Sequence, residues 1–388
     1  DPLHALRTAL ENKRELRFAS GFEIEAEQAD PRLLDEAVEA ATGAEAALVF
    51  LGLPPSYESE GWDREHMDLP SPQLELLARV AAVNANVVVI LANGSALLTA
   101  PIERHARAIL EGWLLGQAGG AAISDLLLGR TSPSGKLAET IPLRFAHNPT
   151  VGNLPGENHE VRYGEGLLIG YRWYDAHELE VAYPFGHGLS YTTFELSGLR
   201  VDVLEDGAAP RVEVTVMATN TGARTGAEVV QVYVSDPAAS VYRPVQELRG
   251  FSKVRLAPGE SREVAVELDG RAFAYWHVAR QEWVVEGGEF LVRVGSSSRD
   301  IRLSEAIWLR GGEFSVPLTL SSTLGEFLAD PQASDWLLAQ LRRSPLGERV
   351  IGTHLGKMLE TLPLNRLARF PGAAFTEADV ECYLQSRG

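Results

Sequence analysis

The sequence contains 388 residues, of which 45% are hydrophobic and 23% are charged, a composition typical of a globular protein with two or three domains. Its net charge of −18 argues against nucleic acid and anionic membranes as partners, and its longest apolar run, 87–92, is far shorter than a membrane span. With one cysteine, Cys382, and no His-x-x-x-His pair beside a glutamate, the sequence predicts neither a disulfide framework nor a metal or cofactor site.

The first half of the sequence alternates predicted helices with apolar strands. Residues 31–41 have apolar side chains at helical spacing with Asp30 as cap, and a second helix is predicted from Ser71, as its cap, to about Val83. Further strands and helices are predicted at 46–51, 87–92, 101–105, 108–115 and 119–128. Because helices separate the strands, we expect parallel pairing and a multidomain protein that begins with an α/β sandwich at 1–190.

Shorter strands with strict alternation of apolar residues follow from about Phe194. The alternation continues to about Leu309 with glycine-containing turns between the strands and no helical pattern, which is typical of an antiparallel β-sandwich of fibronectin or immunoglobulin type. We therefore predict this second domain at 191–310. The pattern then returns to helical spacing, and a short helical extension is predicted at 311–388, with Thr376 as cap of the last helix.

An acidic loop after the strand predicted at 46–51 is the main candidate for chemistry. Ligands of open α/β sheets bind outside the carboxyl ends of the strands, which is where this loop begins. Glycoside hydrolysis needs two carboxyl groups, and an adjacent tryptophan offers a face on which a sugar ring stacks. The alternative is a solvated loop fixed by an ion pair of Arg64 with Asp63 or Asp68, and the residues alone leave both interpretations open. The loop contains Glu58, Glu60, Trp62, Asp63, Arg64, Glu65 and Asp68.

Competing sites have less support in the sequence. The glycine-rich stretch at 112–120 lacks both the Gly-x-Gly-x-x-Gly fingerprint and the Gly-Lys-Ser/Thr ending of a phosphate loop, so a nucleotide role is not favoured. The sequence also has no Gly-x-Ser-x-Gly elbow for a nucleophilic serine.

The acidic loop resembles the acid/base segment of glycoside hydrolase family 3, the β-glucosidase family. The resemblance rests on segments in the family's order and spacing: 58–73 (ESEGWDREHMDLPSPQ), 84–94 (NANVVVILANG), 108–120, 127–137, 163–175, 183–194 (YPFGHGLSYTTF) and 248–260. It covers roughly residues 1–310 and implies a fibronectin type III-like fold for the β-sandwich; the tail resembles an extension found in some bacterial members.

The resemblance also implies roles for single residues. The family's acid/base is the glutamate directly before glycine and three before Asp-Arg, which corresponds to Glu60, with Glu58 as second choice. Trp62 and Tyr57 are expected on the aglycone side as substrate-binding residues. Family members place the nucleophilic aspartate in an N-terminal barrel, so the chain is expected to lack a nucleophile and to need that barrel, in cis or as a separate chain.

The expected activity is therefore that of a retaining, exo-acting β-glucosidase that removes terminal β-D-glucosyl residues from a small glycoside or oligosaccharide. A β-xylosidase or related exo-glycosidase shares the same acid/base, and a non-catalytic module that binds a glycan or a partner is the alternative from another class. The start of the chain shows no signal peptide, which predicts a cytoplasmic location, and a homo-oligomer is compatible with the sequence.

Overall fold

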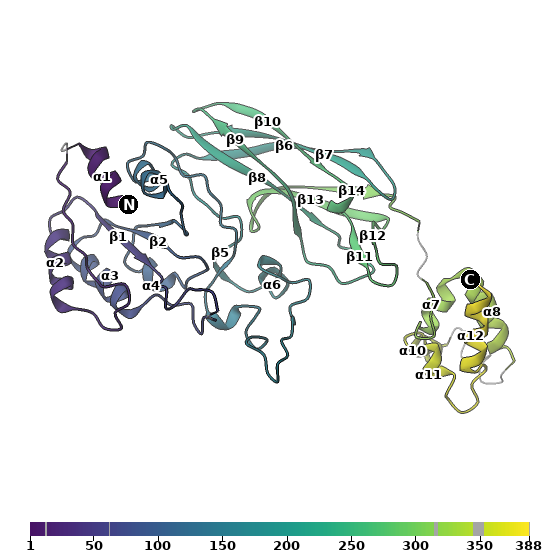
Figure 1. Ribbon diagram of the computed structural model, residues 1–388. Coiled ribbons are helices and arrows are strands. Elements are labelled where there is room, and N and C mark those ends of the chain that lie inside the picture. Colours follow the sequence, from purple (N-terminus) through teal and green to yellow (C-terminus); the bar gives the residue numbers. More distant parts are fainter. Residues whose placement is uncertain (12–13, 62, 314–316, 344–352, 388) are drawn as a thin grey trace. The chain divides into compact units, whose positions relative to one another are not determined.

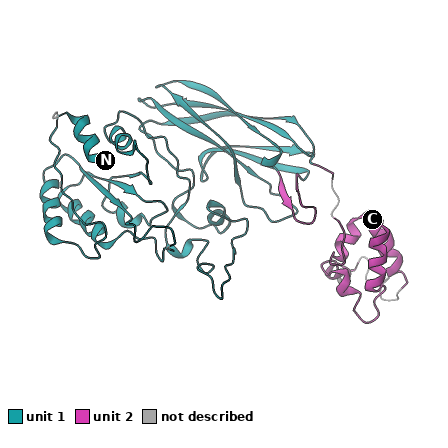
Figure 2. Cartoon of the chain, viewed as in Figure 1, with its two compact units in different colours: residues 1–273, 286–311 teal, residues 274–285, 312–388 magenta. Residues whose placement is uncertain are grey.

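The computed structural model describes residues 1–388 except 12–13, 62, 314–316, 344–352 and 388. These residues form two compact units, one of 1–273 with 286–311 and the other of 274–285 with 312–388 (Figure 2). Among the helices of the described residues, none is both long and apolar enough to cross a membrane.

The first part of the larger unit contains a parallel sheet of order β1-β2-β3 (Figure 1). Its elements are α1 (Pro2–Leu10), α2 (Pro31–Ala41), β1 (Ala47–Gly52), α3 (Ser71–Val83), β2 (Val87–Ala92), α4 (Ala100–Glu103), β3 (Ala108–Glu111), α5 (Gly119–Leu127), β4 (Ile141–Pro142), α6 (Tyr171–Ala176) and β5 (Val181–Tyr183). Parallel pairing is confirmed, with Val49 beside Val89 and Val89 beside Ile109. The parallel register brings the carboxyl ends of the three strands to one edge, where the acidic loop begins.

Apolar burial explains why these elements form. Helices α2 and α3 pack against the sheet through one cluster that includes Leu34, Leu77 and Val89, all at most 1% exposed, while α1 packs against α5. Asp30 caps α2 by accepting from the backbone N–H of Arg32, as predicted.

Two predicted boundaries are wrong. Pro70 rather than Ser71 is the cap residue of α3, and no side chain caps it. The strand predicted at 108–115 ends at Glu111, because Trp113 has a left-handed backbone conformation, with φ of 54°, that does not fit a strand. The apolar residues that follow are outside the sheet.

The second part of the larger unit is an antiparallel β-sandwich, as predicted, with sheets of order β10-β7-β6 and β14-β13-β8-β9. Valines on alternating positions, such as Val214 and Val232, are at most 1% exposed and fill its core. The strands are β6 (Phe194–Glu205), β7 (Arg211–Asn220), β8 (Gly226–Ser235), β9 (Glu247–Leu256), β10 (Ser261–Leu268), β13 (Gly288–Ser297) and β14 (Asp300–Leu309).

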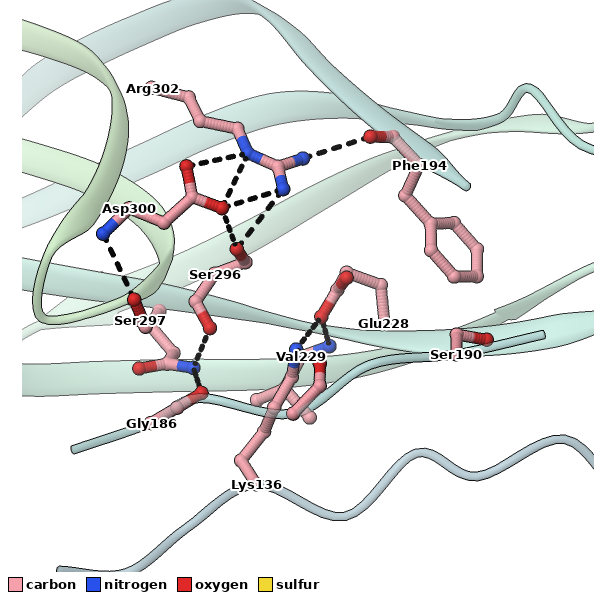
Figure 3. Close-up of polar contacts among 12 residues, drawn as sticks. Lys136, Gly186, Ser190, Phe194, Glu228, Val229, Ser296, Ser297, Asp300 and Arg302 are labelled. Carbon is pink, nitrogen blue, oxygen red and sulfur yellow. Dashed lines mark hydrogen bonds and ion pairs between the residues drawn. The ribbon is translucent and has the colours of Figure 1, made fainter. Parts of the chain in front are cut away.

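Buried polar contacts join the α/β part to this β-sandwich within the larger unit (Figure 3). Lys136 Nζ lies 2.7 Å from Glu228 Oε1 on β8 and donates to the Gly188 carbonyl at 2.9 Å. The Gln231 amide donates to the carbonyl of Gly186 at 3.1 Å. Tyr171 Oη accepts from the backbone N–H of Leu248 at 2.7 Å. The α/β part and the β-sandwich are therefore joined by specific hydrogen bonds as well as by apolar packing.

The smaller unit combines a ribbon of β11 and β12 with a group of helices. Thr323 and Thr376 each form a capping box, with Glu326 and Asp379 respectively, so the predicted cap of the last helix is confirmed. Phe327 is fully buried in the helical core. The elements are β11 (Tyr275–His277), β12 (Glu282–Val284), α7 (Leu324–Ala329), α8 (Pro331–Leu341), α10 (His354–Leu359), α11 (Leu364–Leu367) and α12 (Glu377–Ser386).

Candidate functional site

The acidic loop, residues 53–70, joins the carboxyl end of β1 to the start of α3. The two ends are held together by the buried side chain of Gln73, which lies in the first turn of α3. Its Nε2 donates to the Gly52 carbonyl at 2.7 Å, and its Oε1 accepts from the Gly52 N–H at 2.9 Å. A Cβ at Gly52 would lie 2.4 Å from the Ala92 carbonyl oxygen, so only glycine allows β1 and β2 to end this close together. The acidic loop thus leaves the sheet at a fixed point.

Glu60 is exposed near the middle of the acidic loop. Among the residues that the structure describes, none forms a hydrogen bond or ion pair with its carboxylate. Gly61 follows it with φ of 85° and open space around its Cα, so its conformation rather than its size requires glycine. This turn presents a carboxyl group that a substrate in solution can reach.

Glu58 differs from Glu60 in its surroundings. Its Oε2 accepts from the backbone N–H of Gly94 at 2.7 Å, and its Oε1 accepts from Ser95 Oγ at 3.2 Å. Glu58 is half-buried, and both of its oxygens are engaged by the turn after β2. The first and second choices for the acid/base are therefore in different surroundings: Glu60 is exposed, whereas Glu58 is held by hydrogen bonds.

The other predicted site residues are only partly described. Tyr57 is half-buried, and its ring meets the ring of His66 edge to face, with centroids 5.3 Å apart. Trp62 lies outside the described residues. The suggested ion pair of Arg64 with Asp63 or Asp68 is wrong, since Arg64 Nη1 donates instead to Ser95 Oγ at 2.8 Å and to the Ala96 carbonyl at 3.1 Å.

Two carboxyl groups near the acidic loop were missed by the sequence reasoning. Burial raises the pKa of Glu111, at the end of β3, to about 7, and the charges of Glu58 and Glu139 add to the rise. The Trp113 N–H donates to Glu111 at 3.0 Å, and this hydrogen bond acts to lower the pKa of Glu111. Burial likewise raises the pKa of Glu139, against the nearby charge of Arg64 and a hydrogen bond from the Ala96 N–H.

The signal that could have revealed Glu111 was its place at the end of a parallel strand. A strand predicted to run to 115 hides this glutamate in the middle of an apolar run. Trp113 has φ of 54°, a left-handed conformation that turns the chain away from the sheet and leaves Leu114 70% exposed. The turn after β3 thus places Glu111 at the same edge as the turn after β2.

Replacing Glu111 by glutamine is expected to change how stability depends on pH. The pKa of Glu111 in the folded chain is about 7 against an ordinary value of 4.5, so the folded state holds a proton that the unfolded state releases. Its contribution to stability is full below pH 4.5 and is lost as pH rises through 7. At pH 8 we expect Glu111→Gln to exceed the parent in free energy of unfolding by about 2–3 kcal/mol, and to lose that advantage at pH 4.

Urea unfolding between pH 4 and pH 9 measures this difference. Glu65→Gln, an exposed change on the acidic loop, serves as control and should track the parent at every pH. Parallel curves of unfolding free energy against pH for Glu111→Gln and the parent would contradict the effect assigned to burial of Glu111.

No group of three or more His, Cys, Asp or Glu side chains suited to a metal ion occurs in the described part of the chain. What the edge of the sheet does offer is carboxyl groups in distinct environments: exposed Glu60, bonded Glu58, and partly buried Glu111 and Glu139. Carboxyl groups held in different environments suit acid–base chemistry, in which one group must be protonated while another is ionised.

Comparisons with known proteins identify the family to which the chain is related. Residues 1–191 match the model of the glycosyl hydrolase family 3 C-terminal domain, and residues 228–298 match that of the fibronectin type III-like domain. The chain is 47% identical to an exo-α-(1→6)-L-arabinopyranosidase of Bifidobacterium longum over 95% of its own length and 48% of the relative's. It is 43% identical to the thermostable β-glucosidase B of Acetivibrio thermocellus over 86% of its own length and 44% of the relative's.

A crystal structure of the Bifidobacterium adolescentis GH3 β-glucosidase is similar as well, with a TM-score of 0.80 and 48% identity over 87% of this chain and 49% of that one. The chain therefore spans about half the length of the relatives that it matches. No β/α barrel occurs in the part of the chain that the structure describes. Two family models matched in order, together with these relatives, establish that the chain belongs to glycoside hydrolase family 3, of which it contains the C-terminal α/β and fibronectin type III-like portion.

Proposed function

We propose that this chain supplies the general acid/base of a retaining exo-glycosidase of the β-glucosidase type, and that Glu60 is that residue. The observation that supports it best is the contrast at the edge of the sheet. Glu60 stands exposed between residues that are fixed to the turn after β2, while Glu58 is fully engaged in hydrogen bonds. A residue that must give a proton to a substrate oxygen and later take one from water has to be reachable.

The proposed mechanism divides the chemistry between this chain and a second carboxylate. In the first step Glu60 protonates the oxygen of the leaving group while the second carboxylate attacks the anomeric carbon. In the next step Glu60 accepts a proton from the water that releases the sugar. Retention requires the two carboxyl groups to lie roughly 5 Å apart. We place the nucleophile in the half of the family's proteins that this chain does not span, as a barrel in the same polypeptide or in another chain.

Glycoside specificity is the finer part of the proposal. The relatives named above are a β-glucosidase and an α-L-arabinopyranosidase. In its favoured chair each of these glycosides has an equatorial leaving oxygen, so one proton donor on one side of the ring serves both. We propose terminal β-D-glucosyl residues as substrate, with Tyr57 and Trp62 bordering the leaving group.

The chain together with its barrel, in the same polypeptide or as a separate chain, tests the proposal; below, this whole enzyme is called the full-length protein. We expect it to hydrolyse 4-nitrophenyl β-D-glucoside with retention of configuration, followed by NMR, and the 388-residue chain alone to show no turnover. Faster hydrolysis of the α-L-arabinopyranoside or β-D-xyloside would correct the sugar and keep the mechanism. Absence of hydrolysis of every aryl glycoside, with retained binding of an oligosaccharide, would contradict the enzyme and favour a binding module.

A further inference from the structure

The segment that contains Glu60 is attached at both ends to the same short turn, residues 93–96, which follows β2. On one side Glu58 accepts from the Gly94 N–H at 2.7 Å and from Ser95 Oγ at 3.2 Å. On the other side Arg64 Nη1 donates to Ser95 Oγ at 2.8 Å and to the Ala96 carbonyl at 3.1 Å. The Ser95 hydroxyl thus donates to Glu58 and accepts from Arg64, which matches its capacity of one donor and two acceptors. We call Glu58, Ser95 and Arg64 the Ser95 anchor.

The turn that receives these contacts is itself well fixed. Asn93 is fully buried, and its Nδ2 donates to the Ser95 carbonyl at 3.0 Å. Ala96 is 4% exposed. A Cβ at Gly94 would lie 2.9 Å from Glu58 Oε1 and 3.1 Å from the Leu114 side chain, so the close approach of Glu58 depends on glycine at this position. A turn fixed in this way, which donates to Glu58 and accepts from Arg64, holds the acidic loop at a defined place relative to β2.

Electrostatic attraction also stabilises the Ser95 anchor. The Arg64 guanidinium is half-buried, and this burial lowers its pKa, while the negative charges of Glu58 and Glu139 act in the opposite sense. The cation therefore stabilises Glu58 and Glu139 in a poorly hydrated place, and they stabilise it. Hydrogen bonds in which a partner is ionised are about twice as strong as neutral ones, so the Ser95 anchor holds the segment more firmly than ordinary loop contacts do.

We propose that the residues of the Ser95 anchor are positioning residues for Glu60, an inference that rests on the proposed function of Glu60. Glu60 is two residues after Glu58 and four before Arg64 in the sequence, so the attachment of Glu58 and Arg64 to one turn limits how far Glu60 can lie from that turn. The anchor groups touch each other and the turn after β2 rather than the substrate. Their effect on catalysis is to keep the proton donor in register with the leaving oxygen, where a displacement of about 1 Å costs on the order of 10²-fold in rate.

Ser95→Ala in the full-length protein tests this inference with the smallest change, because it removes the hydroxyl that joins the two sides. We expect kcat/KM, which reports the first step, to fall about 10- to 100-fold on a phenyl glycoside, whose leaving group needs protonation, and less than about 3-fold on the 2,4-dinitrophenyl glycoside, which needs none. KM for the phenyl glycoside should change little. Ser95→Thr, which keeps a hydroxyl, should restore most of the rate on the phenyl glycoside.

Glu58→Gln and Arg64→Met give the same test from the two sides of the anchor, with Glu65→Gln as the matched control on the acidic loop. Thermal unfolding of each variant identifies any that fails to fold. If Glu58→Gln and Arg64→Met fail to fold, Ser95→Ala alone tests the positioning role. Equal losses of kcat/KM on both substrates in folded Ser95→Ala, or no loss of kcat/KM at all, would overturn the positioning role. If Glu60→Gln also leaves phenyl glycoside turnover unchanged, the proposed function fails; if Glu60→Gln is slow while Ser95→Ala is normal, only the inference about the anchor fails.

Discussion

Glu60→Gln in the full-length protein is expected to lower kcat by roughly 10²- to 10⁴-fold on glycosides with poor leaving groups, the usual contribution of a general acid. Glutamine keeps the size and polarity of the side chain but has no proton to give to the leaving oxygen. On a 2,4-dinitrophenyl glycoside, whose leaving group departs unprotonated, the first step should keep most of its rate. The fall in kcat/KM, which reports this first step, should therefore grow as the basicity of the leaving group increases, and a series of aryl glycosides measures that slope.

Azide gives an independent check on the same residue. With Glu60→Ala and an activated substrate, the sugar–enzyme intermediate accumulates because no base deprotonates water. Azide needs no base and should both restore turnover and yield the glycosyl azide with retained configuration. Glu65→Gln should resemble the parent on every substrate. Unchanged turnover of Glu60→Gln on the phenyl glycoside would contradict the assignment.

Much of the α/β part follows from local sequence patterns. The helix α2 and its Asp30 cap were predictable because a polar N-cap, a proline and apolar residues at helical spacing all act over a few residues. The buried strand β2 was predictable for the same reason, as a continuous apolar run between turns. The Ser71 cap was wrong because Pro70, held in an extended conformation, already ends the acidic loop and lets the helix start at once.

The candidate site was less predictable because its contacts join distant segments. Spacing alone places Glu58 and Glu60 in one acidic loop, and the family resemblance ranks Glu60 first. The contacts that separate them in the fold come from Gly94 and Ser95, more than thirty positions later in the sequence. The sequence suggests local partners for Arg64, Asp63 or Asp68, as one interpretation of the loop, but in the fold Arg64 donates to Ser95 instead. Sequence patterns specify which strands form, whereas the groups gathered at their ends depend on how the turns after those strands are shaped.

The largest expected effect on stability lies at the ion pair of Lys136 and Glu228, between the α/β part and the β-sandwich (Figure 3). Their side chains are 13% and 8% exposed, and Glu228 also accepts from the backbone N–H of Val229 at 2.8 Å. Lys136→Met should reduce the free energy of unfolding by about 3–5 kcal/mol, because it leaves the Glu228 carboxylate buried without its cation. Urea unfolding measures the loss, and hydrogen exchange of the amides in β8 shows whether the loss includes that strand.

A double variant distinguishes the effect of losing the ion pair from the effect of leaving one buried charge without its partner. Lys136→Met combined with Glu228→Leu removes both charges and fills similar volume, so most of the lost stability should return, since a well-packed apolar pair often equals a buried ion pair. Arg79→Met serves as the control, because its partners Glu75 and Asp35 are on the surface and its removal should cost at most about 1 kcal/mol. If the double variant is as unstable as Lys136→Met alone, the ion pair itself, rather than an uncompensated charge, stabilises the junction. If Lys136→Met unfolds like the control, then Glu228 finds water or another donor, and the junction depends on Gln231 and Tyr171 instead.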